Sequence, residues 1–253
     1  MIRTAALLAS TAVTLGGCGG DDGEGAGKPR LTVSAATSLT NAFEEYGENF
    51  EAATPRFTFA GSDEGAAQIR QGVKPDLYAA ANPRLPDQLF EEGLVERPVT
   101  FAGNRLVIAV SQDRDDIASI EDLSKDDVQL VIGSDGVPVG EYAREVIGRL
   151  APAKGETILD NVRSEEPDVA GVVGKLTQGA ADAGFLYITD VTAAGQDVKA
   201  VELPVELRPS IEYGVAVVKG AKEPAAATAF IDGLLNGRGL EAMRRAGFEP
   251  PPE

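Results

Sequence analysis

The sequence contains no histidine, no tryptophan and a single cysteine. Histidine is the commonest general base and metal ligand in proteins, so its absence excludes a Ser-His-Asp hydrolase and the usual metal centres. One cysteine excludes an internal disulfide, a cysteine-rich zinc site and a CxxC redox motif. We therefore expect a protein that is not an enzyme, with no cofactor and no side chains that ligate a metal cation directly.

Basic residues are scarce relative to acidic ones. Lys and Arg number 23 against 40 Asp and Glu, which gives a formal net charge of −17. Nucleic-acid-binding proteins usually carry a basic surface, so nucleic acid is not expected as a partner. The apolar fraction of 43% and the charged fraction of 25% are normal for a soluble globular protein. A length of 253 residues suggests one large domain or two small lobes.

The N-terminal segment resembles the signal peptide of a lipoprotein, over residues 1–17. Arg3 provides a basic start, and residues 5–15 form an apolar run too short to span a bilayer. Leu15-Gly16-Gly17-Cys18 is similar to a lipobox, which predicts a lipid on Cys18; an ordinary signal peptide is the alternative. Residues 18–29 are rich in glycine and acids and predict a flexible tether. The expected location is the outer face of the cytoplasmic membrane, or the periplasm.

Beyond the tether, short apolar runs alternate with segments of helical periodicity. This alternation predicts an α/β fold with mainly parallel sheets. The expected strands are 31–36, 57–60, 77–81, 106–110, 130–132, 184–187, 200–203 and 213–218. The expected helices are 39–50, 66–71, 86–92, 120–123, 141–150, 169–178, 224–235 and 240–245.

Small or hydroxyl-bearing residues stand at several junctions between a strand and a helix. Ser38, Ser62, Val139 and Asp168 each lie where a helix is expected to begin. A helix start carries free backbone N–H groups and a positive dipole end, so several starts in one cleft would bind an anion without Lys or Arg. Serine and aspartate are also common N-caps, so plain capping is the alternative. The pattern alone leaves both interpretations open.

In chain order, these junctions resemble the motifs of the molybdate-binding proteins of bacterial ABC importers (ModA-type). The similar segments are 35–43 (AATSLTNAF), 59–65 (FAGSDEG), 103–107 (GNRLV), 137–143 (VPVGEYA), 181–190 (ADAGFLYITD) and 213–217 (YGVAV). The six segments stand in the family's order, and the resemblance, which ends at Gly247-Phe248, extends over essentially all of residues 31–248. A single such motif would be weak, but the ordered set is specific.

The resemblance implies a type II periplasmic-binding-protein fold with two α/β lobes and the ligand in the cleft between them. We expect residues 30–105 and 214–253 to form lobe one and residues 106–213 to form lobe two. Two crossing strands would join the lobes. Closure on the ligand would create the surface that the membrane permease of the ABC importer reads. We expect a monomer.

The resemblance also implies the residues that bind the oxyanion, which are Ser38, Ser62, Val139, Val169 and Tyr187. Val139 stands where the family often has alanine, and it would act through its backbone N–H. A second valine, in Asn161-Val162-Arg163, matches a family motif by its letters. Val169 lies 18 residues before Tyr187 and Val162 lies 25 before it, and only the first separation fits the family. We therefore expect Val169 to bind and Val162 to lie elsewhere.

The implied ligand is molybdate, a tetrahedral dianion that a pocket of hydrogen-bond donors accepts and that carries no proton. Tungstate is nearly the same size and is expected to bind too. The alternatives are the same fold binding sulfate, phosphate or ferric iron, an enzyme that uses Tyr187 with a nearby aspartate, or a structural domain with a vestigial cleft. Asp63 and Glu64 adjoin the predicted site, and a carboxylate that faces the cleft would count against oxyanion binding.

Overall fold

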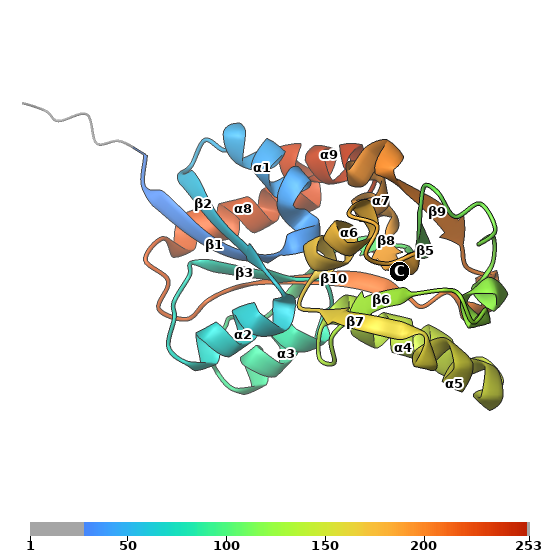
Figure 1. The fold of residues 1–253 in the computed structure, drawn as a ribbon. Coiled ribbons are helices and arrows are strands. Elements are labelled where there is room, and N and C mark those ends of the chain that lie inside the picture. Colours follow the sequence, from blue (N-terminus) through green and yellow to red (C-terminus); the bar gives the residue numbers. More distant parts are fainter. Residues whose placement is uncertain (1–27, 252–253) are drawn as a thin grey trace, which may run out of the picture.

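The structure, a computed structural model, describes residues 28–251. The predicted signal peptide, Cys18 and most of the predicted tether lie outside the described residues. The described chain forms two five-stranded sheets, each covered by helices on both faces (Figure 1). Within residues 28–251, no helix is both long enough and apolar enough to cross a membrane.

The first sheet has the strand order β2-β1-β3-β10-β4. Its strands are β1 (Arg30–Ala36), β2 (Thr54–Ala60), β3 (Leu77–Ala80), β4 (Val99–Asn104) and β10 (Ile211–Val217). β1 pairs in parallel with β2 and β3, whereas β10 pairs antiparallel with β3 and β4.

The second sheet has the order β7-β6-β8-β5-β9. Its strands are β5 (Leu106–Ser111), β6 (Leu130–Gly133), β7 (Val162–Glu166), β8 (Ala183–Tyr187) and β9 (Val198–Glu202). β6 pairs in parallel with β7 and β8, and β5 pairs antiparallel with β8 and β9. Each sheet therefore has as many antiparallel as parallel pairings, and the expectation of mainly parallel sheets is wrong.

The antiparallel pairings come from the two places where the chain passes between the sheets. β4 leads through Arg105 directly into β5, and the segment after β9 leads into β10. Strands that enter a sheet from the other sheet run against those that are connected by helices within it. Sheet one thus uses residues 30–104 and 211–217, and sheet two uses residues 106–202. The exact lobe boundaries stay a prediction.

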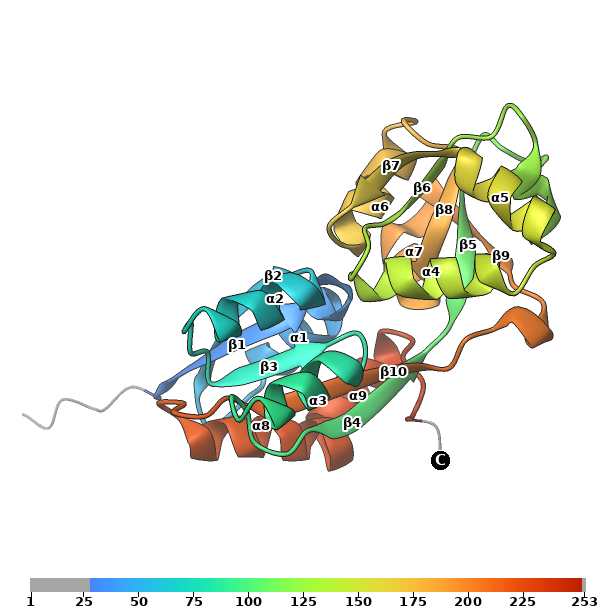
Figure 2. The same cartoon turned by 90° about the horizontal axis from the view of Figure 1, so that it is seen from below.

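Helices cover both faces of each sheet, as Figure 1 and Figure 2 show from two directions. On sheet one, α2 (Ser62–Arg70) and α3 (Arg84–Glu91) lie on one face. The other face carries α1 (Thr40–Glu48), α8 (Pro224–Asn236) and α9 (Arg238–Arg245). On sheet two, α4 (Pro138–Gly148) lies opposite α6 (Val169–Thr177) and α7 (Ile188–Ala194), and α5 (Pro152–Asp160) packs on α4. Short 3₁₀ turns complete the chain: η1 (Thr37–Leu39), η2 (Ile120–Ser124), η3 (Gly195–Asp197) and η4 (Val205–Leu207).

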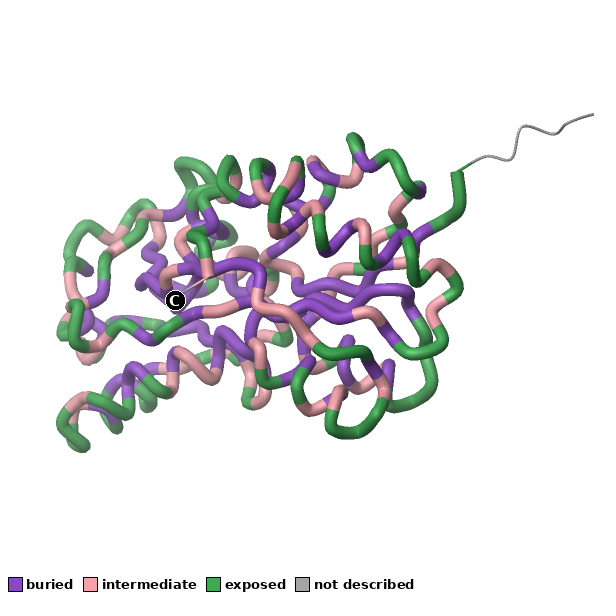
Figure 3. Tube along the Cα trace, turned by 180° about the vertical axis from the view of Figure 1, so that it is seen from behind, coloured by how far each residue is buried: buried purple, intermediate pink, exposed green. Residues whose placement is uncertain are grey.

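Buried residues are concentrated in the strands between the helical layers, and exposed residues lie mainly on the outer helices and loops (Figure 3). The central strands β3 and β8 are buried along their whole length, because helices cover both of their faces. The core of sheet one contains a cluster of phenylalanines, in which the ring of Phe43 lies 6.1 Å from that of Phe101 and 5.4 Å from that of Phe230. These packed layers hold the strand ends and helix starts in fixed positions.

Four elements were not expected from the sequence, namely β4, β7, α5 and α7. β7 reads VRSEE and is an edge strand with exposed positions, so it has no apolar run. In α5 only Gly155 and Ile158 are buried, which leaves no amphipathic pattern to recognise. α7 contains four β-branched residues, which favour strands over helices. Tertiary packing decides the structure of these segments.

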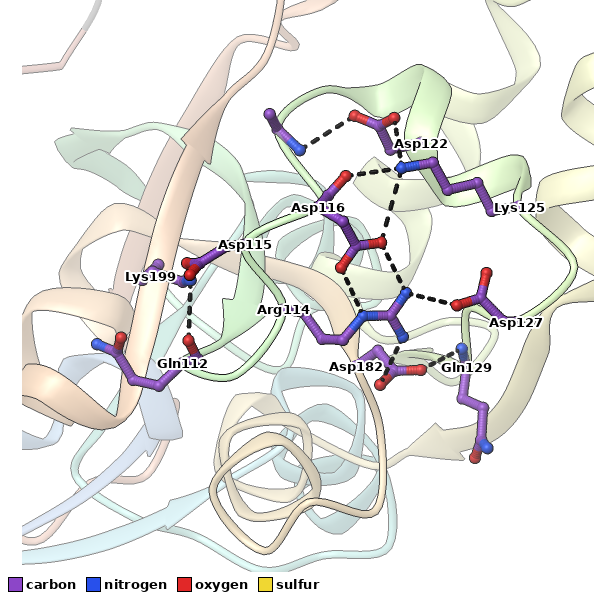
Figure 4. A network of polar contacts seen from close by, with 11 residues as sticks. Gln112, Arg114, Asp115, Asp116, Asp122, Lys125, Asp127, Gln129, Asp182 and Lys199 are labelled. Atoms are coloured by element: carbon purple, nitrogen blue, oxygen red, sulfur yellow. Dashed lines mark hydrogen bonds and ion pairs between the residues drawn. The ribbon is translucent and has the colours of Figure 1, made fainter.

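A cluster of ion pairs lies at the end of sheet two where β5 finishes and β6 and β8 begin (Figure 4). Arg114 is only 17% exposed and contacts three carboxylates, with distances of 2.9 Å to Asp116, 3.1 Å to Asp127 and 2.9 Å to Asp182. Asp182 also accepts a hydrogen bond from the Gln129 N–H at 2.7 Å. Arg114 therefore fastens the loop after β5 to the starts of β6 and β8.

Candidate functional site

The carboxyl ends of strands from both sheets meet at a small cavity. Its volume is about 20 Å³ for the centre of a water-sized sphere. The lining residues are Ala36, Thr37, Ser38, Ala60, Gly61, Ser62, Ala81, Val137, Pro138, Val139, Asp168, Val169 and Tyr187. In open α/β sheets, ligands bind at this edge, beyond the ends of the strands.

The structure brings all five predicted oxyanion-binding residues to this cavity. Ser38 and Ser62 come from sheet one, while Val139, Val169 and Tyr187 come from sheet two. Val162 does not line the cavity. It is the first residue of β7 and pairs with Leu130, at the opposite end of sheet two. The placement of the two valines is the one expected from their spacing, and the binding role of Val169 stays a prediction.

Three of the helix starts that face the cavity have no side-chain cap. The N-cap residues of η1, α2 and α4 are Ala36, Gly61 and Val137, and none makes a capping hydrogen bond. Only α6 is capped, because Asp168 accepts a hydrogen bond from the Gly171 N–H at 2.9 Å. The interpretation of these junctions as plain caps therefore fails for three of the four. Their N–H groups point to a ligand as their partner.

Ser62 begins α2 and is 3% exposed. Its Oγ accepts a hydrogen bond from the Ala81 N–H at 3.1 Å, and its carbonyl accepts one from the Tyr78 hydroxyl at 2.6 Å. Tyr78 reaches this carbonyl beside Gly65, where a Cβ would lie 3.0 Å from the tyrosine ring. The glycine in α2 thus makes room for the residue that holds Ser62. With its Oγ already accepting, Ser62 has its own proton free to donate into the cavity.

Ser38 lies in η1 and is also held by hydrogen bonds. Its Oγ lies 3.0 Å from the hydroxyl of Tyr213, and the Nδ2 of Asn104 donates to the same tyrosine hydroxyl at 3.3 Å. Tyr213 and Asn104 are both buried and come from β10 and β4. The sequence placed both within similar motifs but did not mark either as part of the site. Only three-dimensional structure shows that they contact Ser38.

Tyr187 ends β8 and is fully buried. Its hydroxyl is one of two buried side-chain polar atoms without a hydrogen-bond partner in the described residues. Burial raises the pKa of this phenol well above its usual range, and the neighbouring Tyr213 raises it further. The group therefore keeps its proton and is a donor. A buried donor without a partner is costly, which indicates that a ligand supplies the acceptor.

The cavity lining contains no Lys or Arg and one carboxylate, that of Asp168. Both of its oxygens accept hydrogen bonds, from Gly171 N–H and from the Thr37 hydroxyl at 3.0 Å. Asp63 and Glu64 do not line the cavity. Glu64 accepts a hydrogen bond from Gln68 at 3.0 Å on the surface of α2, whereas the Oδ1 of Asp63 is buried without a partner near Gly61.

Asp190 is a second buried acid close to the site. It is 8% exposed and its Oδ2 accepts a hydrogen bond from the Tyr187 N–H at 3.2 Å. Burial raises the pKa of Asp190 to about 7, and the charge of Asp168 adds to this effect. In the described part of the chain, no three Asp, Glu or Cys side chains are grouped so that they could hold a metal ion.

Contacts between the two sheets' helices close the cavity. Besides the hydrogen bond from Thr37 to Asp168, Arg84 at the start of α3 forms an ion pair with Glu141 of α4 at 2.5 Å. Gly61 approaches the carbonyl of Pro167 so closely that a Cβ would lie 2.5 Å from its oxygen. The backbone of Gly61 has φ −56° and ψ 140°, which any residue can adopt. Glycine is needed here only for the close approach.

A larger cavity of about 650 Å³ lies between α1 and α9 on one side and α6 and α7 on the other. Of the five predicted binding residues, only Ser38 and Val169 line it. Small apolar side chains such as Ala42, Val173 and Ala193 form much of its wall. The predicted binding residues thus converge on the smaller cavity.

Known proteins share both sequence and fold with this chain. Residues 31–249 match the family of bacterial extracellular solute-binding proteins. The molybdate-binding protein ModA of Mycobacterium tuberculosis (strain H37Rv) is 34% identical over 231 residues, which cover 89% of this chain and 86% of that protein.

Two solved structures have the same fold. The periplasmic molybdate-binding protein of Azotobacter vinelandii superposes with a TM-score of 0.76 at 19% identity, over 88% of this chain and 100% of that one. The sulfate-binding protein SubI of M. tuberculosis gives 0.78 at 18% identity, over 88% and 87%. The predicted two-lobed α/β fold is confirmed. The chain belongs to the family of bacterial extracellular solute-binding proteins.

Proposed function

We propose that the chain is an extracytoplasmic solute-binding protein that captures molybdate, and also tungstate, and delivers it to the permease of an ABC importer. The observation that carries this proposal is the buried, unpartnered hydroxyl of Tyr187 in a cavity without Lys or Arg. Uncapped helix starts and two serine hydroxyls face the same cavity. The molybdate-binding relatives supply the identity of the ion.

The size of the cavity suits a compact ion. Its volume of about 20 Å³ for the centre of a water-sized sphere leaves room for a guest of a few heavy atoms. A tetrahedral oxyanion is of this kind, whereas a sugar phosphate is larger. We infer that cavity size separates molybdate and tungstate from the smaller sulfate, since charge and shape are the same.

The energetics agree with tight binding. Hydrogen bonds to a charged partner contribute roughly 1.5–3 kcal/mol each, so about six of them give on the order of 10–20 kcal/mol. Association and lobe closure cost roughly 4–15 kcal/mol of that. A dissociation constant in the micromolar to nanomolar range, about 8–12 kcal/mol, lies within the resulting interval. Local N–H and O–H dipoles supply this attraction, because the net charge of −17 repels an anion at long range.

The proposal extends to the finer features expected from the sequence. We infer that a lipid on Cys18 anchors the protein at the outer face of the cytoplasmic membrane. We infer that it acts as a monomer, without a cofactor and without catalysis. Mass spectrometry of the protein purified from membranes tests the anchor, since a diacylglycerol on Cys18 adds a defined mass to the N-terminal peptide.

A second candidate ligand is hydrogen phosphate, and the observation that favours it is Asp168. A protonated oxyanion needs an acceptor, and this is the one carboxylate in the lining. Against it, both oxygens of Asp168 already accept hydrogen bonds from the protein. A carboxylate next to a dianion without a proton costs free energy unless hydrogen bonds from the protein stabilise its charge, as they do at Asp168.

Isothermal titration of the purified chain with molybdate, tungstate, sulfate and phosphate tests the function. We expect molybdate and tungstate to bind at least about 100-fold more tightly than sulfate or phosphate, a difference of roughly 3 kcal/mol. Tyr187→Phe should weaken molybdate binding by about 10- to 150-fold, the loss of one charged hydrogen bond.

Tyr46→Phe is the matched control, because the Tyr46 hydroxyl is also buried and donates to the carbonyl of Phe230, away from the cavity. Tighter binding of phosphate than of molybdate would replace the proposed ligand. Equal losses of affinity in the two tyrosine variants would remove Tyr187 from the site.

A further inference from the structure

The hydroxyl of Ser38 ends a chain of hydrogen bonds that begins at the junction between the two sheets. The Asn104 side chain stands at the end of β4, one residue before the chain passes into sheet two. Its Nδ2 donates to the Tyr213 hydroxyl at 3.3 Å, and that hydroxyl lies 3.0 Å from the Oγ of Ser38. Neither Asn104 nor Tyr213 lines the cavity, so these two residues would act on a ligand through Ser38.

The orientation of the Asn104 amide is fixed. Its Oδ1 accepts a hydrogen bond from the Arg105 N–H at 2.8 Å, so the amide nitrogen must face the other way. That nitrogen donates both to Tyr213 and to the Oγ of Thr189, at 2.9 Å. The Tyr213 hydroxyl therefore accepts a hydrogen bond from Asn104, because an amide nitrogen has no lone pair to offer.

The direction of the hydrogen bond between Tyr213 and Ser38 follows from the Tyr213 proton, which still needs an acceptor. Tyr213 is 0% exposed, and burial raises the pKa of its phenol well above the usual range, so the proton stays on. The acceptor within reach of that proton is the Oγ of Ser38. If Ser38 donated instead, the Tyr213 proton would be buried without an acceptor among the described residues, at a cost of about 1–3 kcal/mol.

We propose that Tyr213, held by Asn104, is a positioning residue that directs the Ser38 proton towards the cavity and so contributes to the selectivity of the site against protonated oxyanions. Ser38 accepts from Tyr213 and has its own proton free to donate into the cavity. An anion that brings its own proton then finds no acceptor at this position. The selectivity part of this inference rests on the proposed function.

Ser62 reaches the same state by a different route. Its Oγ accepts from the Ala81 N–H, a backbone donor that side-chain substitution does not remove. The two serines on the sheet-one side of the cavity are therefore both donors, one set by the backbone and one by Tyr213. Of these two hydrogen bonds to a serine Oγ, only the one from Tyr213 to Ser38 can be removed by substituting a side chain, and that side chain does not line the cavity.

Tyr213→Phe tests the proposal in the full chain. The Ser38 hydroxyl becomes free to rotate and to accept, so we expect molybdate binding to weaken about tenfold. The ratio of the phosphate to the molybdate dissociation constants should fall by at least about tenfold near pH 7, where phosphate carries a proton. Tyr46→Phe is again the control and should leave this ratio unchanged. A purely structural loss would weaken both anions alike and would leave the ratio in place.

A double-mutant cycle separates positioning from general damage. In a Ser38→Ala background, Tyr213→Phe should change molybdate affinity by less than about twofold, because the hydroxyl that it positions is gone. The proposal would be overturned if the double variant lost molybdate affinity by the product of the two single losses. It would also be overturned if Tyr213→Phe alone left the ratio of the phosphate to the molybdate dissociation constants unchanged.

The proton order can also be measured without any oxyanion. A buried, hydrogen-bonded tyrosine hydroxyl exchanges slowly, so we expect an NMR signal for the Tyr213 proton with a nuclear Overhauser contact to the β-protons of Ser38. Asn104→Ala should weaken or remove this signal. A wild-type chain that shows the signal but binds no oxyanion would contradict the proposed function and keep the proton order. A spectrum in which the Ser38 hydroxyl proton contacts the Tyr213 ring would overturn the order itself.

Discussion

The two ends of sheet two differ in what surrounds their carboxylates. Around Arg114, carboxylates stand at the surface and each has a cation beside it. Arg114 holds the pKa of Asp116 well below its usual range, and a hydrogen bond from Lys125 lowers the pKa of Asp122 to about 2. Near the cavity, Asp190 is buried without a cation, and burial raises its pKa to about 7.

This difference shows how an acidic chain can carry a site of the kind proposed for an anion. In the cluster around Arg114, guanidinium and ammonium groups contact the aspartates at the surface. The cavity instead offers N–H and O–H dipoles that belong to a rigid framework and cost no desolvation of a buried cation. A buried arginine would attract every anion, whereas fixed dipoles favour one that matches them in size and protonation.

The largest effect that separates the two regions is the pH dependence of stability at Asp190. Its folded-state pKa is raised, so the native state holds a proton that the unfolded state releases, and stability falls as pH rises from about 4 to 7. A rise from 3.8 to about 7 is worth on the order of 4 kcal/mol at most.

Asp190→Asn should remove this loss while keeping the acceptor for the Tyr187 N–H. Urea unfolding at pH 5 and pH 8 is the measurement, and the variant should gain stability over the wild type mainly at pH 8. Asp113→Asn, which changes an exposed aspartate, is the control. A variant whose advantage is the same at both pH values would show that Asp190 does not titrate in this window.

Arg114→Ala should lower the melting temperature by about 2–4 °C, the expected size for the loss of about 1 kcal/mol in a domain of this length. Stability that depends on the contact of Asp116 with Arg114 is present above the usual aspartate pKa and is lost as pH falls through the lowered pKa of Asp116. The deficit of the variant should therefore be largest near neutral pH and shrink in acid, opposite to the trend at Asp190. Differential scanning calorimetry measures it, and molybdate affinity should stay unchanged.

Arg84→Gln removes the ion pair with Glu141 that joins the two lobes' helices beside the cleft. Arg84 is 44% and Glu141 35% exposed, so the pair is worth about 0.2–1 kcal/mol. Molybdate should dissociate up to about fivefold faster, because the pair links helices of the two sheets beside the cavity and its loss removes up to about 1 kcal/mol. Stopped-flow dissociation measures this, with Arg70→Gln as the control, since Arg70 pairs with Glu92 within sheet one's helices. A faster release in both variants would show a nonspecific effect.

Salt should have the smallest effect on the cavity and a clear one on the cluster. Raising the ionic strength from about 0.1 to 1 M shortens the screening length from about 10 Å to 3 Å. The difference in melting temperature between wild type and Arg114→Ala should shrink. The molybdate dissociation constant, measured by titration in the same buffers, should change less than about threefold, because the attraction is local. A tenfold loss of affinity would indicate that long-range charge, and not fixed dipoles, holds the ion.

Much of the fold follows from patterns that are local in sequence. The helices at Val169 and Pro224 show apolar spacing, and strands such as Leu77–Ala80 are short apolar runs. The strand VRSEE of β7 carries no such signal, because an edge strand needs only its backbone to pair. The antiparallel direction of β10 is likewise not indicated by its own sequence. It depends on where the chain returns from the other sheet.

The site divides in the same way. The five predicted residues follow from the resemblance, because each stands at a strand end or a helix start that the motifs mark. The contact of Tyr213 with Ser38 joins residues 175 positions apart, and the approach of Gly61 to Pro167 joins two lobes. Neither residue type shows such a role by itself. Pairings of this kind need the three-dimensional arrangement.

The tyrosines of the cleft have one more consequence. Without tryptophan, the near-ultraviolet emission of this chain comes from its five tyrosines. Three of them stand edge to face in a row, with ring centroids 6.4 Å apart between Tyr142 and Tyr187 and 5.8 Å apart between Tyr187 and Tyr213. Under the proposed function, the ion accepts a hydrogen bond from Tyr187 and so contacts the middle member of this row. If the proposed function holds, binding of the ion should therefore change the tyrosine emission of the unlabelled protein.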